Sequence, residues 1–158
     1  MIIRNLFLIS FATAAAAAAG MTQAASPSPS TPHPFVVEIS VEPAAKARLE
    51  RLKEQIIVRA IYSGEPTRAK AKFANEIGEI DLGSEAIELP SGGGTASFSG
   101  SVGNDKWTWV KEPQVLINIS SAFHAVKENI LDCGTAPFQD SFKVAQSKPI
   151  RKSCKLLK

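Results

Sequence analysis

Residues 55–64 constrain the fold of this chain more than any other segment. The segment reads QIIVRAIYSG and has the densest run of β-branched residues in the sequence. One set of alternate positions carries only apolar side chains, Ile56, Val58, Ala60 and Tyr62. Arg59 interrupts the opposite face, which therefore stays partly wet. This alternation predicts an interior strand of an antiparallel sheet, with neighbouring strands paired around it.

The first 25 residues are a predicted signal peptide. Arg4 supplies a positive charge, residues 6–19 are apolar and end in six alanines, and residues 20–25 are rich in small side chains. This order is typical of secretory signals. The apolar run is too short and alanine-rich for a spanning helix, which needs ~20 apolar residues. We expect cleavage after Ala24 or Ala25, a periplasmic or secreted product, and no transmembrane segment in the mature chain. The alternative is an uncleaved N-terminal anchor.

The two cysteines, Cys133 and Cys154, are the only ones in the sequence. In an exported chain, two cysteines are most simply interpreted as one disulfide. Their spacing does not form a CxxC motif, and neither has a neighbouring histidine that would suggest a zinc site. The bridge would fasten a predicted last strand, residues 150–157, to the rest of the domain and prevent its fraying.

The remaining pattern predicts a Ser/Pro-rich linker over residues 26–34, with His33 exposed, and a single domain over residues 35–158. Alternation over residues 35–41, 95–102 and 113–123 indicates further strands. Pro43 suits the first position of a short helix over residues 43–53. We predict an all-β fold, an immunoglobulin-like antiparallel β-sandwich of about seven strands with one short helix. The alternative is a small closed β-barrel.

Four segments have weaker signals. Residues 65–76 fit a poor edge strand or a long loop, and residues 77–90 fit two short strands broken at Gly83 and Ser84. Residues 127–129 resemble a hairpin turn, with a short helix over residues 122–128 as the weaker alternative. Residues 134–149 read as loop-rich.

Five side chains form a possible ligand surface. Trp107 and Trp109 are two residues apart, which would place them on one strand face, either lining a ligand groove or packing in the core. Arg68, Lys70 and Lys72 alternate with alanines. Basic residues of this kind also protect the edge of a sheet from aggregation without binding any ligand.

No catalytic, cofactor or metal site is predicted. The acidic residues lack the order of a calcium loop, so we interpret them as acids on the exterior of strands: Glu76, Glu79, Asp81, Glu85 and Glu88. Residues 91–94 lack the Lys-Ser/Thr of a phosphate-binding loop. His124 has no recognisable triad partner, although grouping with Asp132 or Glu128 in a deep pocket would favour an enzyme. The net charge of +3 is too small for a nucleic-acid binder.

Three strings carry a resemblance to other proteins, namely residues 62–66 (YSGEP), 75–84 (NEIGEIDLGS) and 129–133 (NILDC). They resemble small exported proteins of Gram-negative bacteria. The resemblance implies an exported compartment and the same fold, and it identifies no functional residue.

These observations predict an exported, non-enzymatic binding or interaction domain of the bacterial periplasm or cell envelope. Its partner would be a protein or an envelope component, and no cofactor is expected. The alternative is a proteinaceous inhibitor of a hydrolase such as lysozyme, acting through a loop at residues 91–94 or 103–106.

Overall fold

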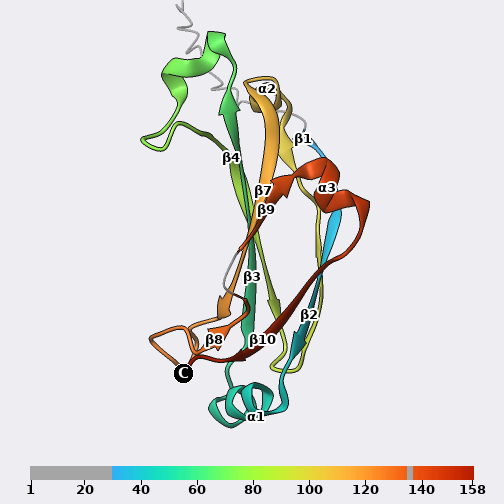
Figure 1. The fold of residues 1–158 in the computed structure, drawn as a ribbon, viewed down its shortest axis with the longest axis vertical. Coiled ribbons are helices and arrows are strands. Elements are labelled where there is room, and N and C mark those ends of the chain that lie inside the picture. The colour runs from blue at the N-terminus through green and yellow to red at the C-terminus, as the bar shows by residue number, and fades with distance from the viewer. Residues whose placement is uncertain (1–29, 135–136) are drawn as a thin grey trace, which may run out of the picture.

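The computed structural model describes residues 30–134 and 137–158 as two four-stranded sheets that face each other (Figure 1). The first sheet has the order β5 (Gly93–Phe98), β2 (Phe35–Val41), β10 (Ile150–Leu156) and β8 (Leu131–Asp132). The second has the order β4 (Ile80–Leu89), β3 (Ile56–Pro66), β7 (Val110–Ser121) and β9 (Phe138–Ser141). A small pair joins β1 (Ser30–Thr31) to β6 (Val102–Gly103). The predicted signal peptide lies outside the described residues.

The predicted β-sandwich is confirmed, but its immunoglobulin-like strand order is not. In the immunoglobulin arrangement the first two strands are neighbours in one sheet. Here β2 and β3 belong to different sheets, because helix α1 (Pro43–Leu52) carries the chain from one to the other. Strand β2 pairs in parallel with the last strand, β10. Across residues 30–134 and 137–158 the two sheets stay separate and do not close into the alternative barrel.

Strand β3 is the predicted interior strand. It pairs with β4 on one side and with β7 on the other, both antiparallel. Its predicted inward face is fully buried at all four positions, Ile56, Val58, Ala60 and Tyr62. The two paired neighbours satisfy the backbone hydrogen bonds of a strand that water cannot reach. The prediction of an interior strand with this buried face is therefore confirmed, and β3 begins one residue later and ends two residues later than the predicted segment, residues 55–64.

An aromatic cluster fills one end of the core. The Phe35 and Phe98 rings of the first sheet stack with centroids 5.1 Å apart, and Tyr62 of the second sheet meets Phe35 edge-on. Phe142 packs against Tyr62 at 5.1 Å and belongs to helix α3 (Phe142–Ser147). This helix and strand β9 lie in the stretch predicted to be loop-rich. They were missed because each is too short to show a clear period.

Helix α1 forms where the sequence predicts a short helix, and it caps the opposite end of the sandwich (Figure 1). Pro43 stands at its start, where its missing N–H is not needed. Ala45 and Leu49 are buried against the sheets. Lys53 ends the helix in the left-handed region, with φ of 56°. The chain then turns directly into β3.

His33, which the proline-rich pattern predicted to be exposed, is half-buried. Its ring stacks on Trp107 with centroids 3.9 Å apart and planes 5° apart. Its backbone N–H donates to the carbonyl oxygen of Ser99 at 2.9 Å. A few alternating prolines do not reveal such contacts, because these depend on residues far along the chain.

Two of the weaker segments form structures other than those predicted. Residues 65–76 contain a 3₁₀ helix, η1 (Arg68–Phe73), and one continuous strand, β4 (Ile80–Leu89), occupies most of residues 77–90. The predicted break in β4 is a shift of register, since Tyr62 pairs with Gly83 whereas Ser63 pairs with Asp81. The extra residue of this bulge is absorbed within the ladder, so the strand does not end there.

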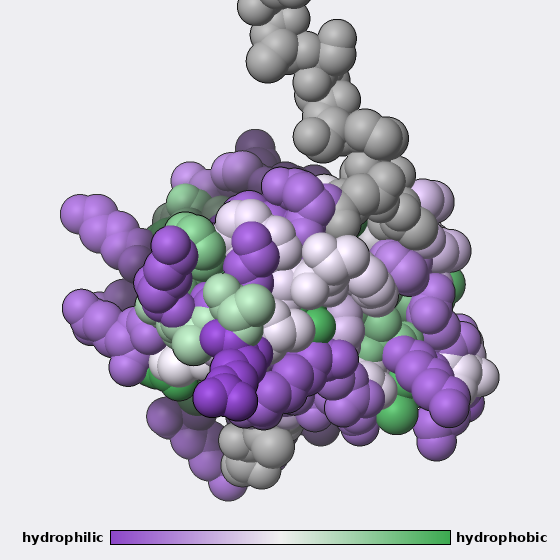
Figure 2. Space-filling view, turned by 90° about the horizontal axis from the view of Figure 1, so that it is seen from above, coloured by the Kyte–Doolittle hydropathy of each residue, from purple (hydrophilic) through white to green (hydrophobic). Residues whose placement is uncertain are grey.

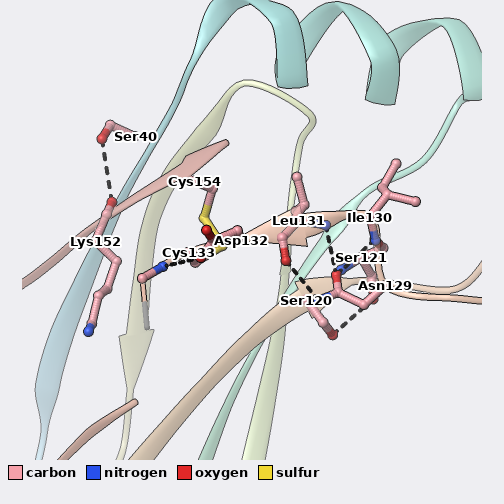
Figure 3. Close-up of a disulfide and its surroundings, with 11 residues drawn as sticks. Ser40, Ser120, Ser121, Asn129, Ile130, Leu131, Asp132, Cys133, Lys152 and Cys154 are labelled. Atoms are coloured by element: carbon pink, nitrogen blue, oxygen red, sulfur yellow. Dashed lines mark hydrogen bonds between the residues drawn. A yellow bond between two sulfur atoms is a disulfide. The ribbon is translucent and has the colours of Figure 1, made fainter. Parts of the chain in front are cut away.

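The predicted disulfide between Cys133 and Cys154 is confirmed (Figure 3). Cys133 follows β8, and Cys154 lies on β10. A side-chain network continues this connection to β7. The Asn129 carboxamide oxygen accepts from the backbone N–H of Ser121 and of Leu131, both at 3.0 Å. The side chain of Asn129 therefore accepts the hydrogen bond from the end of β7 that a backbone carbonyl of a longer β8 would otherwise accept.

Among the described residues, no helix has the length and apolar character needed to cross a membrane.

Replacing both Cys133 and Cys154 by serine should lower the free energy of unfolding by about 3 kcal/mol, because the bridge closes a loop with a sequence separation of 21. Urea unfolding of the oxidised protein and of the double variant measures the difference. Reduction by dithiothreitol should lower the free energy of unfolding of the natural protein to a similar extent and leave that of the double variant unchanged. Equal stability of oxidised and reduced protein would contradict this role.

Candidate functional site

Four surface cavities of about 290 to 360 Å³ line the sheets, and none is a deep pocket for chemistry. One of them lies between β9, α3 and β10 and is walled by Phe138, Val144 and Ile150. Within the described ranges, no three His, Cys, Asp or Glu side chains are grouped as they would be to hold a metal ion.

The connection from β3 to β4 is the most prominent projection of the fold, at the end opposite α1 (Figure 1). Gly64 lets the end of β3 lie against the start of β7, because a Cβ there would be 2.9 Å from the Cβ of Val110. The Thr67 backbone N–H then donates to the carbonyl oxygen of Trp109 at 2.8 Å. This bond fixes the start of η1 beside Trp109.

The three-residue period of η1 decides which side chains meet. In a 3₁₀ helix, residues three apart eclipse each other, so Lys70 and Phe73 share one side. The Lys70 ammonium nitrogen lies 4.3 Å from the centroid of the Trp109 ring, and the Phe73 and Trp109 centroids are 5.0 Å apart. The Lys72 ammonium lies 5.0 Å from the centroid of the Phe73 ring. Cation–π contacts thus tie two lysines to two aromatic rings.

Ile77 projects from the next turn of the same connection. The Asn75 carboxamide oxygen accepts from the backbone N–H of Ile77 at 3.1 Å and of Glu79 at 3.0 Å. This side-chain turn holds the loop in shape. Ile77 is 79% exposed and Phe73 is 48% exposed.

We call this group the η1 surface: Arg68, Lys70, Lys72, Phe73, Ile77 and Trp109. Figure 2, which views the molecule from this end, shows apolar side chains lying among long hydrophilic ones.

The structure brings together four of the five predicted ligand residues and separates the fifth. Arg68, Lys70, Lys72 and Trp109 belong to the η1 surface. Trp107 ends helix α2 (Asn104–Trp107) and packs between His33 and Phe142. The strand predicted for the two tryptophans is wrong, because α2 and a turn occupy these positions and β7 begins only at Val110.

The two tryptophans therefore form no common groove. The Trp109 ring is covered by Lys70 and Phe73, and Trp107 stacks on His33. Phe73 and Ile77 were missed from the sequence. The spacing of three between Lys70 and Phe73 is the signal that could have found Phe73.

The cations of the η1 surface have no carboxylate partners among the described residues. The ion pairs within 4.0 Å lie elsewhere, on other lysines, an arginine and a histidine. The nearest along the chain joins Lys111 to Glu65, at the end of β3. Arg68, Lys70 and Lys72 are thus available to a negatively charged ligand.

Glu85 is an acid of the predicted exterior set that points inward instead. It lies opposite Ala60 in the β3–β4 ladder, so the two side chains share the core face. Its carboxylate accepts from the Tyr62 hydroxyl at 2.8 Å and from the backbone N–H groups of Ser99 and Ser101. Burial alone raises the pKa of Glu85, but these hydrogen bonds outweigh burial and lower it. Burial, together with Glu85, raises the pKa of Tyr62.

Glu54 is a second enclosed carboxylate, at the junction of α1 and β3. It is 1% exposed and accepts backbone N–H bonds from Ala125 at 2.7 Å and from Val126 at 3.1 Å. Burial alone raises its pKa, and the backbone hydrogen bonds from Ala125, Gln55, His124 and Val126 outweigh burial and lower it. Both carboxylates are ionised at neutral pH, and both accept hydrogen bonds from groups of the same domain. Neither therefore carries a proton to donate as a general acid.

The other residues considered for chemistry are dispersed. His124 is exposed and pairs with Glu88 at 3.0 Å, which raises the pKa of its imidazole; Asp132 pairs with Lys155 instead. The bends at residues 123–128 match neither the predicted hairpin turn nor the short helix.

The loops considered for an inhibitor are held within the fold. Residues 91–94 form a tight turn in which the Gly93 N–H donates to Pro90, and a Cβ on Gly93 would lie 2.3 Å from the Ile39 carbonyl oxygen. In residues 103–106, the Lys106 ammonium donates to the Asp81 carbonyl oxygen at 3.3 Å.

Comparison with known proteins gives no relative, since no protein-family model, curated protein or solved structure matches this chain.

The two carboxylates should make the fold sensitive to acid. Their folded pKa lies below the ordinary value of 4.5, so their stabilisation is complete above that pH and is lost as the pH falls through the folded pKa. Replacing Glu54 and Glu85 by glutamine should lower the free energy of unfolding at neutral pH by about 2 kcal/mol for each site.

Urea unfolding from about pH 7 to about pH 3 measures both effects. The double variant should lose less stability on acidification than the natural protein. Glu50→Gln is the matched control, because Glu50 is an exposed acid of α1 that pairs only with Lys46. A double variant with the acid dependence of the natural protein would contradict the assignment.

Proposed function

We propose that this chain is an exported, non-enzymatic binding domain of the bacterial periplasm or cell envelope, and that the η1 surface binds its partner. The observation that carries the proposal is the contact of Lys70 and Lys72 with the exposed ring of Phe73, on a 3₁₀ helix that begins at Arg68; none of these three cations has a carboxylate partner within residues 30–134 and 137–158. Exposed cation–π contacts contribute only ~0.5–1 kcal/mol each, so stability is a weak reason to hold this group at the surface. A binding role accounts for it.

The charge of the site favours a negatively charged partner. Like charges placed close together repel, and an anionic ligand in contact with them relieves this repulsion. Lys70 is already oriented by the Trp109 ring, so binding sacrifices less side-chain entropy than for a free lysine. The partner class is therefore an anionic component of the cell envelope, or a protein with an acidic face.

The position of the site suits binding. The η1 connection is anchored by β3 and by the Thr67–Trp109 bond, and it projects from the end opposite α1 (Figure 1). A partner can approach it without meeting the rest of the sandwich. Rigid sheets beneath a projecting loop are a common arrangement for recognition.

The disulfide supports an exported location. Bridges between cysteines persist in oxidising compartments such as the periplasm and are rare in the cytosol. Cys133 and Cys154 form one within the domain. The signal-like pattern of residues 1–25 agrees with this location.

A charge-removal variant tests the proposal. Arg68→Gln, Lys70→Gln and Lys72→Gln together should abolish most retention on isolated membranes and peptidoglycan of a Gram-negative bacterium. Exposed charge contacts contribute roughly 0.5–1 kcal/mol each, so losing three should weaken retention by about tenfold or more. Co-sedimentation at micromolar protein measures the bound fraction.

The matched control removes three charges from the opposite end of the molecule, with Lys46→Gln, Arg48→Gln and Arg51→Gln on α1. It should bind like the natural protein, and circular dichroism should show both variants folded. Equal loss in both variants would indicate a net-charge effect. That result, or no retention of the natural protein, would refute the proposed surface.

A further inference from the structure

We infer that the anionic partner of the η1 surface is the lipid bilayer itself, with Phe73 and Ile77 entering the headgroup region while the neighbouring cations contact lipid phosphates. This inference rests on the proposed function and narrows it to one partner.

The shape of the site fits a flat and extended partner. Small molecules bind in concave sites that cover most of their surface. The four cavities described above include no residue of 67–79 and not Trp109. The η1 surface projects outward, and a convex knob of this kind can meet a planar membrane surface.

The apolar residues of the η1 surface are of the types that proteins place at membrane interfaces. Large hydrophobic side chains that are exposed within the described residues are few: Phe73, Ile77, Phe123, Val144 and Leu157. Phe73 and Ile77 lie four residues apart on a single projection. Trp109 packs beneath Phe73 with its ring half-buried. Aromatic and aliphatic tips combined with lysine and arginine are typical of surfaces that bind in the interface.

The charges show how such contact would work. Residues 67–81 carry three basic side chains and three acidic ones, Glu76, Glu79 and Asp81, so their net charge is 3 − 3 = 0. Long-range attraction to an anionic membrane is therefore weak, and the cations act at contact. The apolar tips must supply the rest of the binding free energy. Glu76 is exposed beside Ile77 and opposes the approach.

The test uses protein-free vesicles in three compositions: phosphatidylglycerol with phosphatidylethanolamine, phosphatidylethanolamine with phosphatidylcholine, and phosphatidylcholine alone. Flotation measures binding of the full domain. The natural protein should float with the anionic vesicles only. Quenching of Trp109 fluorescence by brominated lipid, measured in a Trp107→Phe background, should show that this end of the molecule faces the bilayer.

Variants separate the two contributions. The change Arg68→Gln, Lys70→Gln and Lys72→Gln should lower the partition coefficient about fivefold for each cation, or on the order of a hundredfold in all. Phe73→Ser with Ile77→Ser should lower it about tenfold or more. Phe123→Ser with Leu157→Ser is the matched control, because both residues are exposed and lie outside the η1 surface. It should bind normally.

Glu76→Gln provides a gain of function, because it removes the negative charge beside Ile77 and should raise binding to anionic vesicles about fivefold. Circular dichroism and urea unfolding should show this variant as stable as the natural protein, because a partly unfolded chain also binds lipid through exposed core residues. Tighter binding by a folded Glu76→Gln variant would support direct contact, and unchanged binding would contradict it.

The outcomes distinguish this inference from the proposed function. If the natural protein fails to bind anionic vesicles while the charge variant still reduces retention on cell envelopes, the bilayer inference is wrong and the partner is a protein or polysaccharide of the envelope. Normal vesicle binding by the Phe73→Ser, Ile77→Ser variant would also overturn it. If the charge variant changes neither assay, both the inference and the proposed surface are wrong.

Discussion

The two-sided pairing of β3 is the constraint on which the rest of the structure depends. Strand β3 lies inside its sheet, so the backbone groups of both its edges need strand partners, because unpaired backbone groups away from water are costly. Strands β4 and β7 provide them. The same pairing brings the start of β7 beside the end of β3, where Thr67 bonds to Trp109. The β-ladder of the core thereby determines where the η1 surface stands.

The segments outside this ladder are held by polar and covalent links. Glu85 joins the edge strand β4 to the chain after β5, and so connects the two sheets at one edge. The Glu54 carboxylate accepts hydrogen bonds from the backbone N–H groups of residues 124–126 and so holds this segment in place. The disulfide and Asn129 fasten β8 to β10 and β7. Each link occurs where an element is too short, or lies too near an edge of a sheet, to be held in place by hydrophobic burial alone.

Local pattern predicted some of the long elements well, although it divided β4 into two short strands. Strands β2, β3 and β10 and helix α1 were predicted to within a residue or two, because each has a clear period and a sharp boundary such as Pro43. The pairing of Cys133 with Cys154 was also predictable, since no other cysteine competes. Sheet membership was not, because α1 carries the chain to the other sheet, and nothing in the alternation of residues 35–64 encodes that choice.

The candidate site was only partly predictable. The alternation of Arg68, Lys70 and Lys72 resembles an edge strand, yet the segment folds as a 3₁₀ helix whose period of three brings Lys70 beside Phe73. The spacing of Trp107 and Trp109 also fits a strand, but a short helix and a turn direct the two rings to different neighbours. His33 shows the same limit, since its partner Trp107 is remote in sequence. Contacts between distant segments decided these cases, and short local patterns do not contain them.

We propose that one end of the sandwich, the η1 surface, meets the cell envelope. Hydrogen–deuterium exchange with and without isolated envelope membranes tests this claim most directly, because it reports on every backbone amide without altering the chain. The account predicts slower exchange in residues 67–79 and around Trp109, with no change in helix α1. Unchanged exchange in residues 67–79, or protection confined to another region such as β10, would contradict it.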